Sequence, residues 1–138
     1  MRVMLDFVKA LAGMPRPWRV WVGLMAALNM AAMLFLPRLE AVVVLGAMML
    51  GALIQAAILA RKGFVRLLGI GHFAWLPMLA WLLLRLDTFV ADPLFYNWVL
   101  ALAFVNSVSL VIDTIDVARY ALGEREPHVS PQPFGFYN

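Results

Sequence analysis

Four apolar stretches follow one another along the chain, and each is long enough to cross a lipid bilayer, which takes roughly 20 helical residues. They cover residues 18–36, 41–60, 64–84 and 95–118. A bilayer core offers no water to the backbone, so stretches of this length cross it as α-helices. The pattern predicts an all-α, polytopic membrane protein.

The composition supports this class. Hydrophobic residues make up 64% of the 138 residues and charged residues 14%, and the mean hydropathy is +0.88. A soluble domain has about 45–50% apolar and about 25% charged residues. A water-soluble globule is therefore excluded, and so is a disordered chain, which needs low hydrophobicity and high net charge.

Short polar connections separate the four stretches, at residues 37–38, 61–63 and 85–93. Helices joined by short connections lie side by side and run antiparallel. We therefore expect four antiparallel transmembrane helices in a bundle that occupies residues 16–120.

The N-terminal segment, residues 1–15, has an amphipathic pattern. One helical face would carry Val3, Met4, Phe7, Val8 and Leu11, and charged residues lie elsewhere around the segment. This pattern is typical of a short helix that lies in the membrane interface. A signal peptide is the alternative, but charged residues interrupt the apolar run and no cleavage site follows.

The C-terminal segment, residues 121–138, combines prolines with aromatic residues. The prolines forbid a continued helix, and Phe134, Phe136 and Tyr137 are unusually apolar for a free tail. A frayed terminus is the simpler interpretation. The alternative, which we adopt as a hypothesis, is a cytoplasmic tail that binds a partner.

The basic residues predict the orientation of the helices. Nine of the 11 Lys and Arg residues lie on the side of the two termini, and only Arg38 and Arg85 lie on the other side. By the positive-inside rule both termini are cytoplasmic. The expected location is a bacterial-type inner (plasma) membrane, crossed four times.

Polar residues inside the fourth stretch are the strongest pointers to a site, because polar side chains are costly in lipid. They follow steps of three and four residues, which places them on one stripe of a helix. These residues are Asn106, Ser109, Asp113, Asp116 and Tyr120. The two carboxylates must therefore face the other helices or a partner.

The other stretches carry polar residues at comparable depths, given a rise of about 1.5 Å per residue. These residues are Asn29, Gln55, Arg66 and His72. The depths suggest two pairs: Arg66 with Asp116 near the surface, and His72 with Asp113 or Ser109 below it. The cluster either holds the helices in register or forms a proton- or ion-responsive site, since histidine beside a carboxylate titrates near neutrality. Binding of a cofactor or a lipid headgroup is a third interpretation.

The sequence offers little for chemistry at a metal or a nucleophile. There is no cysteine, and of the two histidines His128 lies in the tail. Haem ligated through His72 would need a second axial ligand from another subunit or a methionine, so we expect no cofactor and no metal. The chain has no catalytic motif, and its net charge of +3 reflects the basic side of the membrane, so we expect no nucleic-acid partner.

Small residues and aromatics complete the pattern. Gly23, Ala27 and Ala31 in the first stretch and Ala47 and Gly51 in the second recur every four positions, a spacing that permits close helix packing within the chain or between copies. Pro77 should kink the third stretch. Aromatic residues near the predicted ends of the stretches suggest a membrane-interface belt: Trp18, Trp21, Trp81, Tyr96 and Trp98.

These features lead us to expect a non-catalytic accessory or scaffold subunit of a larger membrane assembly. Its partners would be the bilayer and other membrane subunits or further copies of itself. The alternative is a small oligomeric channel or transporter for protons, ions or a solute, which would use His72 and Asp113.

Overall fold

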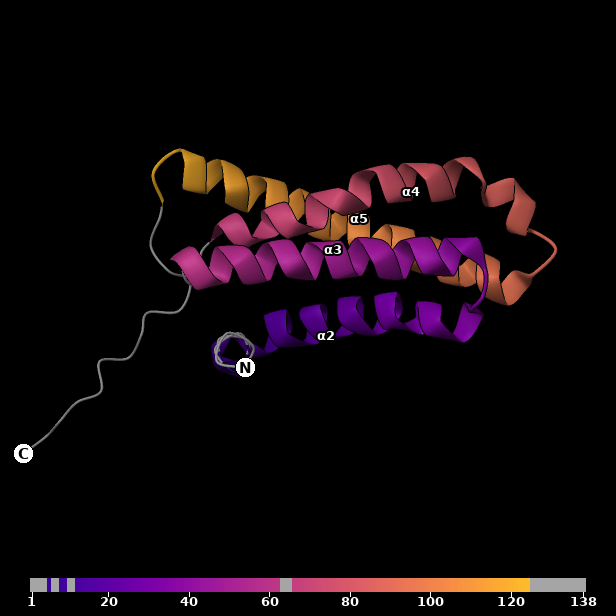
Figure 1. Ribbon diagram of the computed structural model, residues 1–138, viewed down its shortest axis with the longest axis horizontal. Coiled ribbons are helices and arrows are strands. Elements are labelled where there is room, and N and C mark those ends of the chain that lie inside the picture. The colour runs from indigo at the N-terminus through magenta and orange to yellow at the C-terminus, as the bar shows by residue number, and fades with distance from the viewer. Residues whose placement is uncertain (1–4, 6–7, 10–11, 63–65, 125–138) are drawn as a thin grey trace, which may run out of the picture.

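Figure 1 shows a computed structural model of the chain, which describes residues 5, 8–9, 12–62 and 66–124. The described part is helical and has no strand. Four segments are long and apolar enough to cross a membrane: Arg16–Phe35, Leu39–Lys62, Arg66–Leu84 and Pro93–Ala121. The prediction of an all-helical chain with four such segments is confirmed. The N-terminal helix predicted for residues 1–15 lies largely outside the described residues.

Each segment is built from α-helix, from 3₁₀-helix (labelled η), or from both. In chain order the elements are α2 (Arg16–Met30), η1 (Ala31–Phe35), α3 (Leu39–Lys62), η2 (Arg66–Ala74), α4 (Trp75–Leu84), η3 (Leu86–Phe89) and α5 (Pro93–Ala121). The first and third segments therefore change helix type along their length.

Local sequence signals account for both ends of α5. Asp92 precedes the helix and its side chain accepts a hydrogen bond from the Phe95 backbone N–H at 3.2 Å, while Pro93 occupies the first turn, where a missing N–H costs nothing. At the other end Gly123 has a φ of +114°, and the Glu124 N–H bonds back to the Arg119 carbonyl at 3.0 Å. This glycine-dependent cap turns the chain back onto α5.

The chain reverses direction at each short connection, so successive segments run in alternate directions in Figure 1. The start of α2, the end of α3, the start of η2 and the end of α5 all lie at one end of the molecule. The element η2 is packed against both α3 and α5, whereas α2 is packed chiefly against α5. The polar residues of the candidate site lie at this end.

The opposite end holds an aromatic core. Phe95 is fully buried, and the rings of Phe35, Phe89 and Trp98 lie around it with centroids 5.1, 5.0 and 5.4 Å away. Such edge-on and tilted ring pairs are favourable beyond the area they bury. The core joins η1, η3 and the first turns of α5 into one unit.

The third segment departs from α-helical geometry before Pro77. Its first nine residues form η2, which is long for a 3₁₀-helix, a type that rarely exceeds three or four residues. The α-helix begins at Trp75, so Pro77 lies in the first turn of α4, where its missing N–H is tolerated. The irregularity expected at Pro77 thus falls in η2, which contains two glycines of low helix propensity.

Candidate functional site

Side chains of η2 and α5 face each other at two levels. The Arg66 guanidinium donates to Asp116 at 2.7 Å, and His72 Nδ1 lies 2.7 Å from Asp113 Oδ2. All four side chains are at most one-quarter exposed. Both pairs suggested by the depths of these residues are therefore in contact, and His72 is paired with Asp113 rather than with Ser109.

Gln55 of α3 completes the lower level and defines which ring nitrogen of His72 carries the proton. Gln55 Nε2 donates to the Leu68 carbonyl at 3.3 Å and lies 2.9 Å from His72 Nε2. An amide nitrogen has only donor hydrogens, so His72 Nε2 is the acceptor. The ring is then neutral and donates from Nδ1 to Asp113. It is also stacked on Trp75, with centroids 4.2 Å apart.

Glycines allow η2 to come this close to both of its neighbours. A Cβ on Gly69 would lie 2.8 Å from Asp113 Cβ, and a Cβ on Gly71 would lie 2.5 Å from Gln55 Cγ and 2.8 Å from the Gly51 carbonyl oxygen. All three separations are shorter than real Cβ atoms show. Because Gly69 and Gly71 have no side chain, Asp113 and Gln55 can come within reach of His72.

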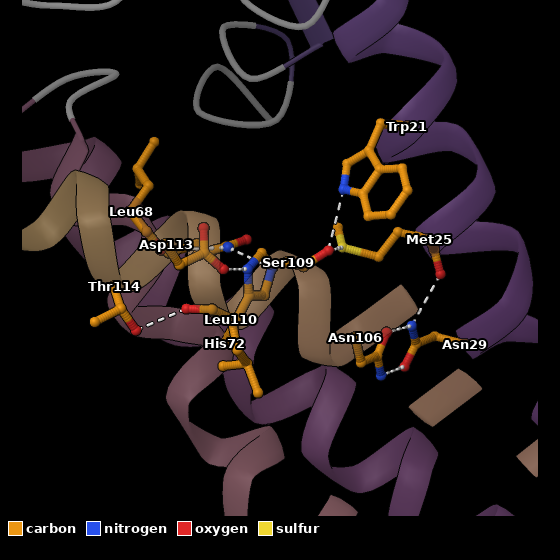
Figure 2. Close-up of polar contacts among 11 residues, drawn as sticks. Trp21, Met25, Asn29, Leu68, His72, Asn106, Ser109, Leu110, Asp113 and Thr114 are labelled. Carbon is orange, nitrogen blue, oxygen red and sulfur yellow. Dashed lines mark hydrogen bonds and ion pairs between the residues drawn. The ribbon is translucent and has the colours of Figure 1, made fainter. Parts of the chain in front are cut away.

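Ser109, one helical turn before Asp113 on α5, is bonded to α2 (Figure 2). Trp21 Nε1 donates to Ser109 Oγ at 3.1 Å, and Ser109 Oγ in turn lies 3.1 Å from Met25 Sδ. Met25 and Ser109 are buried. This contact fixes the Trp21 ring above the polar stripe of α5.

A reciprocal amide pair lies one further turn along. Asn29 Nδ2 donates to Asn106 Oδ1 at 2.9 Å, and Asn106 Nδ2 donates to Asn29 Oδ1 at 3.2 Å (Figure 2). Asn29 Nδ2 also donates to the Met25 carbonyl at 2.8 Å. Both side chains are almost fully buried, so the pair ties α2 to α5 in one register.

A cavity of about 600 Å³ opens between α2 and α5 at the polar end. Its apolar wall is contributed mainly by α2 and includes Trp18, Trp21 and Met25, and its polar wall includes Asp113 and Asp116. Volumes of 300–1,000 Å³ are usual for small-molecule sites. The cavity therefore has the size and the mixed lining of a ligand site.

A second ionic group lies beside the cavity. Glu124 is 2.8 Å from Arg119 and 3.5 Å from Arg66. The hydrogen bond from Arg119 is the main reason that the pKa of the Glu124 carboxyl lies below its ordinary value. Arg66 thus joins two carboxylates, Asp116 and Glu124, at the end of α5.

At the opposite end, two ion pairs were missed from the sequence. Arg85 donates to Glu40 at 2.9 Å, and Arg38 donates to Asp92 at 2.7 Å. In the sequence, Arg38 and Arg85 serve only as signals of orientation. Their partners are more than 40 residues away, and no helical spacing links them, so no local pattern could reveal the pairs.

The polar residues predicted for the four apolar stretches form three contacts in the structure. These contacts are Arg66–Asp116, Gln55–His72–Asp113, and Asn29–Asn106 with Ser109 bonded alongside. Tyr120, the last residue of the stripe, lies 3.5 Å from Lys62 Nζ. The predicted tail residues Phe134, Phe136 and Tyr137, like His128, lie outside the described residues.

One interpretation of an aromatic residue was wrong. Trp98, expected in an interface belt, is buried, and its Nε1 donates to the Leu28 carbonyl at 3.0 Å. Trp21 is half-buried and donates to Ser109 Oγ, and its place in an interface belt stays a prediction. Each belongs to the contact between α2 and α5, because a Trp ring with a bonded N–H can be buried as readily as it can lie at an interface.

The small residues also divide into two groups. Gly51 packs tightly against η2, because a Cβ added to Gly51 would lie 2.7 Å from the Gly71 carbonyl oxygen. Gly23 has nothing within 4 Å of such an atom, and Ala27 is exposed. Ala31, the next member of the stripe, packs against the hydrophobic core, so only the Gly23 and Ala27 part of the stripe is left unpacked within the described chain.

These features define a small all-helical protein with four potential membrane spans and a polar, partly enclosed site at one end. Comparison of the chain with protein-family models, with curated proteins and with solved structures finds no match in any of the three. Within the described part of the chain, no three His, Asp or Glu side chains are grouped so as to hold a metal ion.

Proposed function

We propose that the four segments cross an inner (plasma) membrane of bacterial type as an antiparallel bundle, with both termini in the cytoplasm. The alternate directions of the segments and their apolar outer surfaces support this arrangement. The concentration of Lys and Arg at the end that holds α5's C-terminus supports the orientation. The polar site then lies in the cytoplasmic half of the membrane.

Within that membrane, the protein acts as a non-catalytic accessory or scaffold subunit. The observation that carries this proposal is the uneven burial of the four segments. Only 17% of the most apolar window of Arg16–Phe35 and 11% of that of Leu39–Lys62 are buried, against 39% and 44% for the third and fourth segments. The first two helices thus leave most of their surface to lipid or to another protein.

The outward stripe of small residues on α2 is consistent with a protein neighbour. Gly23 and Ala27 lie on the exposed side of the helix. Small residues let the backbones of two membrane helices approach closely. A partner helix, from another subunit or a second copy, would therefore pack more closely on this face than on a face lined by Leu or Met.

Crosslinking in native membranes tests the proposal. The chain has no cysteine, so Ala27→Cys provides one defined attachment point for a photocrosslinker, and Leu84→Cys, 87% exposed on α4, is the control. We expect a discrete protein adduct from Ala27→Cys and none from Leu84→Cys. Lipid adducts alone at both positions would argue against a subunit role. An adduct of twice 15.4 kDa would identify the partner as a second copy.

The tail offers an independent test. Deletion of residues 127–138 should weaken the association with the partner identified by crosslinking, because the aromatic tail residues supply apolar contacts outside the bundle. The measurement is co-purification in mild detergent at equal expression. Undiminished recovery of the partner would remove the tail from the interface.

A small oligomeric channel or transporter is the second candidate, favoured by the cavity that His72 and Asp113 border. Asp113→Asn separates the two functions. A transporter would lose flux in proteoliposomes while it stayed folded and oligomeric. A scaffold would instead lose assembly or yield, with the same background flux before and after the change.

A further inference from the structure

We infer that the cavity between α2 and α5 is a binding site for an amphipathic organic cation, either a free molecule or the ammonium headgroup of a membrane lipid. The site pairs one surplus carboxylate, Asp113, with an aromatic wall from α2. This binding is independent of whether the protein is a scaffold or a transporter, because it is measured at equilibrium on the isolated chain.

The charges around the cavity leave one carboxylate without a compensating cation. Arg66 and Arg119 are matched by Asp116 and Glu124, all linked at 2.7–3.5 Å. Among the residues that the structure describes, Asp113 has only His72 beside it, and the hydrogen bonds of Gln55 require that ring to be neutral. Glu124 lies outside the cavity lining. Counted together with it, these described side chains have a net charge of −1 that is centred on Asp113, which favours a cation there over an anion.

The position of Asp113 makes that charge costly to leave unmatched. Its side chain is 17% exposed and lies within a helix that is a candidate membrane span. A carboxylate in such surroundings is stabilised by a nearby positive charge. Asp113 lines the cavity directly, so a ligand cation that enters the cavity can supply the charge.

The opposite wall suits the rest of such a ligand. Trp18, Trp21 and Met25 line it, and the Trp21 ring is held in place by its bond to Ser109 at 3.1 Å. The face of a Trp ring attracts organic cations, more strongly where water is excluded. A ligand with an apolar body and one positive charge could therefore pack its body against the α2 wall and place its charge beside Asp113.

The first experiment measures charge preference on the unaltered protein in an uncharged detergent. Tetraphenylphosphonium and tetraphenylborate have nearly the same shape and opposite charges, and binding is followed by tryptophan fluorescence and calorimetry. We expect saturable binding of the cation, one per chain, at least about tenfold tighter than the anion. Equal affinity for the two ions would overturn the proposal without any variant.

The second experiment removes the surplus charge. Asp113→Asn keeps the shape of the side chain and should weaken cation binding by about tenfold or more, as expected for loss of a charged contact. Asp87→Asn, an exposed carboxylate at the other end, is the matched control and should bind within about twofold of the wild type. Unchanged affinity in a folded Asp113→Asn protein would contradict the assignment.

The third experiment distinguishes the two sources of the cation. Native mass spectrometry compares retention of phosphatidylethanolamine and phosphatidylglycerol with identical acyl chains. Preferential retention of the ethanolamine lipid, displaced by tetraphenylphosphonium, would identify a lipid headgroup as the occupant. Equal retention of both lipids alongside tight phosphonium binding would identify a free organic cation.

Discussion

At the scale of single residues, the amide pair Asn29–Asn106 shows how a buried polar group can determine helix register. Each amide donates a hydrogen bond to the other and accepts one from it. Away from water, each amide therefore depends on the other for most of its hydrogen bonding. Interhelical hydrogen bonds in membranes contribute only about 0.6 kcal/mol on average, whereas a buried polar group left alone costs about 1–3 kcal/mol. The pair therefore acts more by penalising other registers than by adding stability.

This asymmetry predicts the outcome of a double-mutant cycle. Asn29→Leu alone should lower the free energy of unfolding by about 1–3 kcal/mol, because it strands the Asn106 amide. Asn29→Leu combined with Asn106→Leu should be less destabilised than the sum of the two single changes. Unfolding by a denaturing detergent, followed by tryptophan fluorescence, provides the measurement.

The matched control is Asn97→Leu, an exposed amide on the same helix, which should change stability by no more than about 0.5 kcal/mol. Strict additivity of the two buried changes would show that the amides do not interact in the folded protein.

Glu124 provides a second prediction at this scale, for pH. Its pKa is lowered by the hydrogen bond from Arg119, so its contact stabilises the folded C-terminal cap above the ordinary glutamate pKa of about 4.3. That contribution is lost as pH falls below this value and through the lowered folded pKa. The protection factors of the amides at the end of α5, which correct for the slower intrinsic exchange in acid, should therefore fall as the medium is acidified below about pH 4.

Glu124→Gln tests the cause. The variant should have lower protection factors at neutral pH, and these should change little further on acidification through the same range. The same pH dependence in Glu124→Gln as in the wild type would assign the effect to another carboxylate.

At the scale of elements, the unusual feature is η2, a 3₁₀-helix packed between α3 and α5. Gly69 and Gly71 sit where any side chain would meet Asp113 or Gln55. A tighter helix with two glycines brings its backbone nearer to both neighbours than an α-helix with side chains would. The geometry of the site is thus a consequence of how η2 packs.

Glycine substitutions test this relationship. Gly69→Ala should destabilise the protein by about 1–3 kcal/mol, the usual cost of overpacking, because the new methyl group must displace Asp113. Gly23→Ala is the control, with nothing within 4 Å of the added atom, and should stabilise its helix by about 0.5–1 kcal/mol.

Thermal or detergent unfolding of the two variants gives the comparison. If Gly69→Ala proved as stable as Gly23→Ala, the close contact between η2 and α5 would not be present in the folded protein. A destabilised Gly69→Ala chain that still bound tetraphenylphosphonium normally would place the ligand away from Asp113.

Much of the polar site was predictable because helix periodicity and depth are both readable from a sequence. Spacings of three and four placed Asp113 and Asp116 on one stripe, and the rise per residue put Arg66 and His72 at matching levels. Periodicity does not reveal how a helix is rotated toward its neighbours, so the roles of Trp21 and Trp98 could not be foreseen. Nor does composition distinguish α-helix from 3₁₀-helix, since the choice at η2 depends on packing against two other elements.

At the scale of the whole molecule, the two ends differ in kind. One end is closed by the aromatic core around Phe95 and by two ion pairs, Glu40–Arg85 and Arg38–Asp92. The other end is held by buried polar contacts and opens into the cavity. Which of them faces the cytoplasm decides whether a ligand reaches Asp113 from inside or outside the cell.

The distribution of basic residues predicts that the cavity end is cytoplasmic, and single cysteines can test this in a chain that has none. Val90 is 62% exposed in the connection at the aromatic end, and Leu122 is 88% exposed just after α5. In intact cells a membrane-impermeant maleimide should label Val90→Cys, and it should label Leu122→Cys only after the membrane is opened.

Each variant serves as the control for the other, because both positions are accessible in the folded chain and differ only in the side of the membrane they occupy. The reverse labelling pattern would place the cavity on the outer side, where the positive-inside rule would have failed. Labelling of both positions from outside would mean that residues 90 and 122 lie on the same side of the membrane. In that case α5 would not span the bilayer, and Asp113 would not lie inside the membrane.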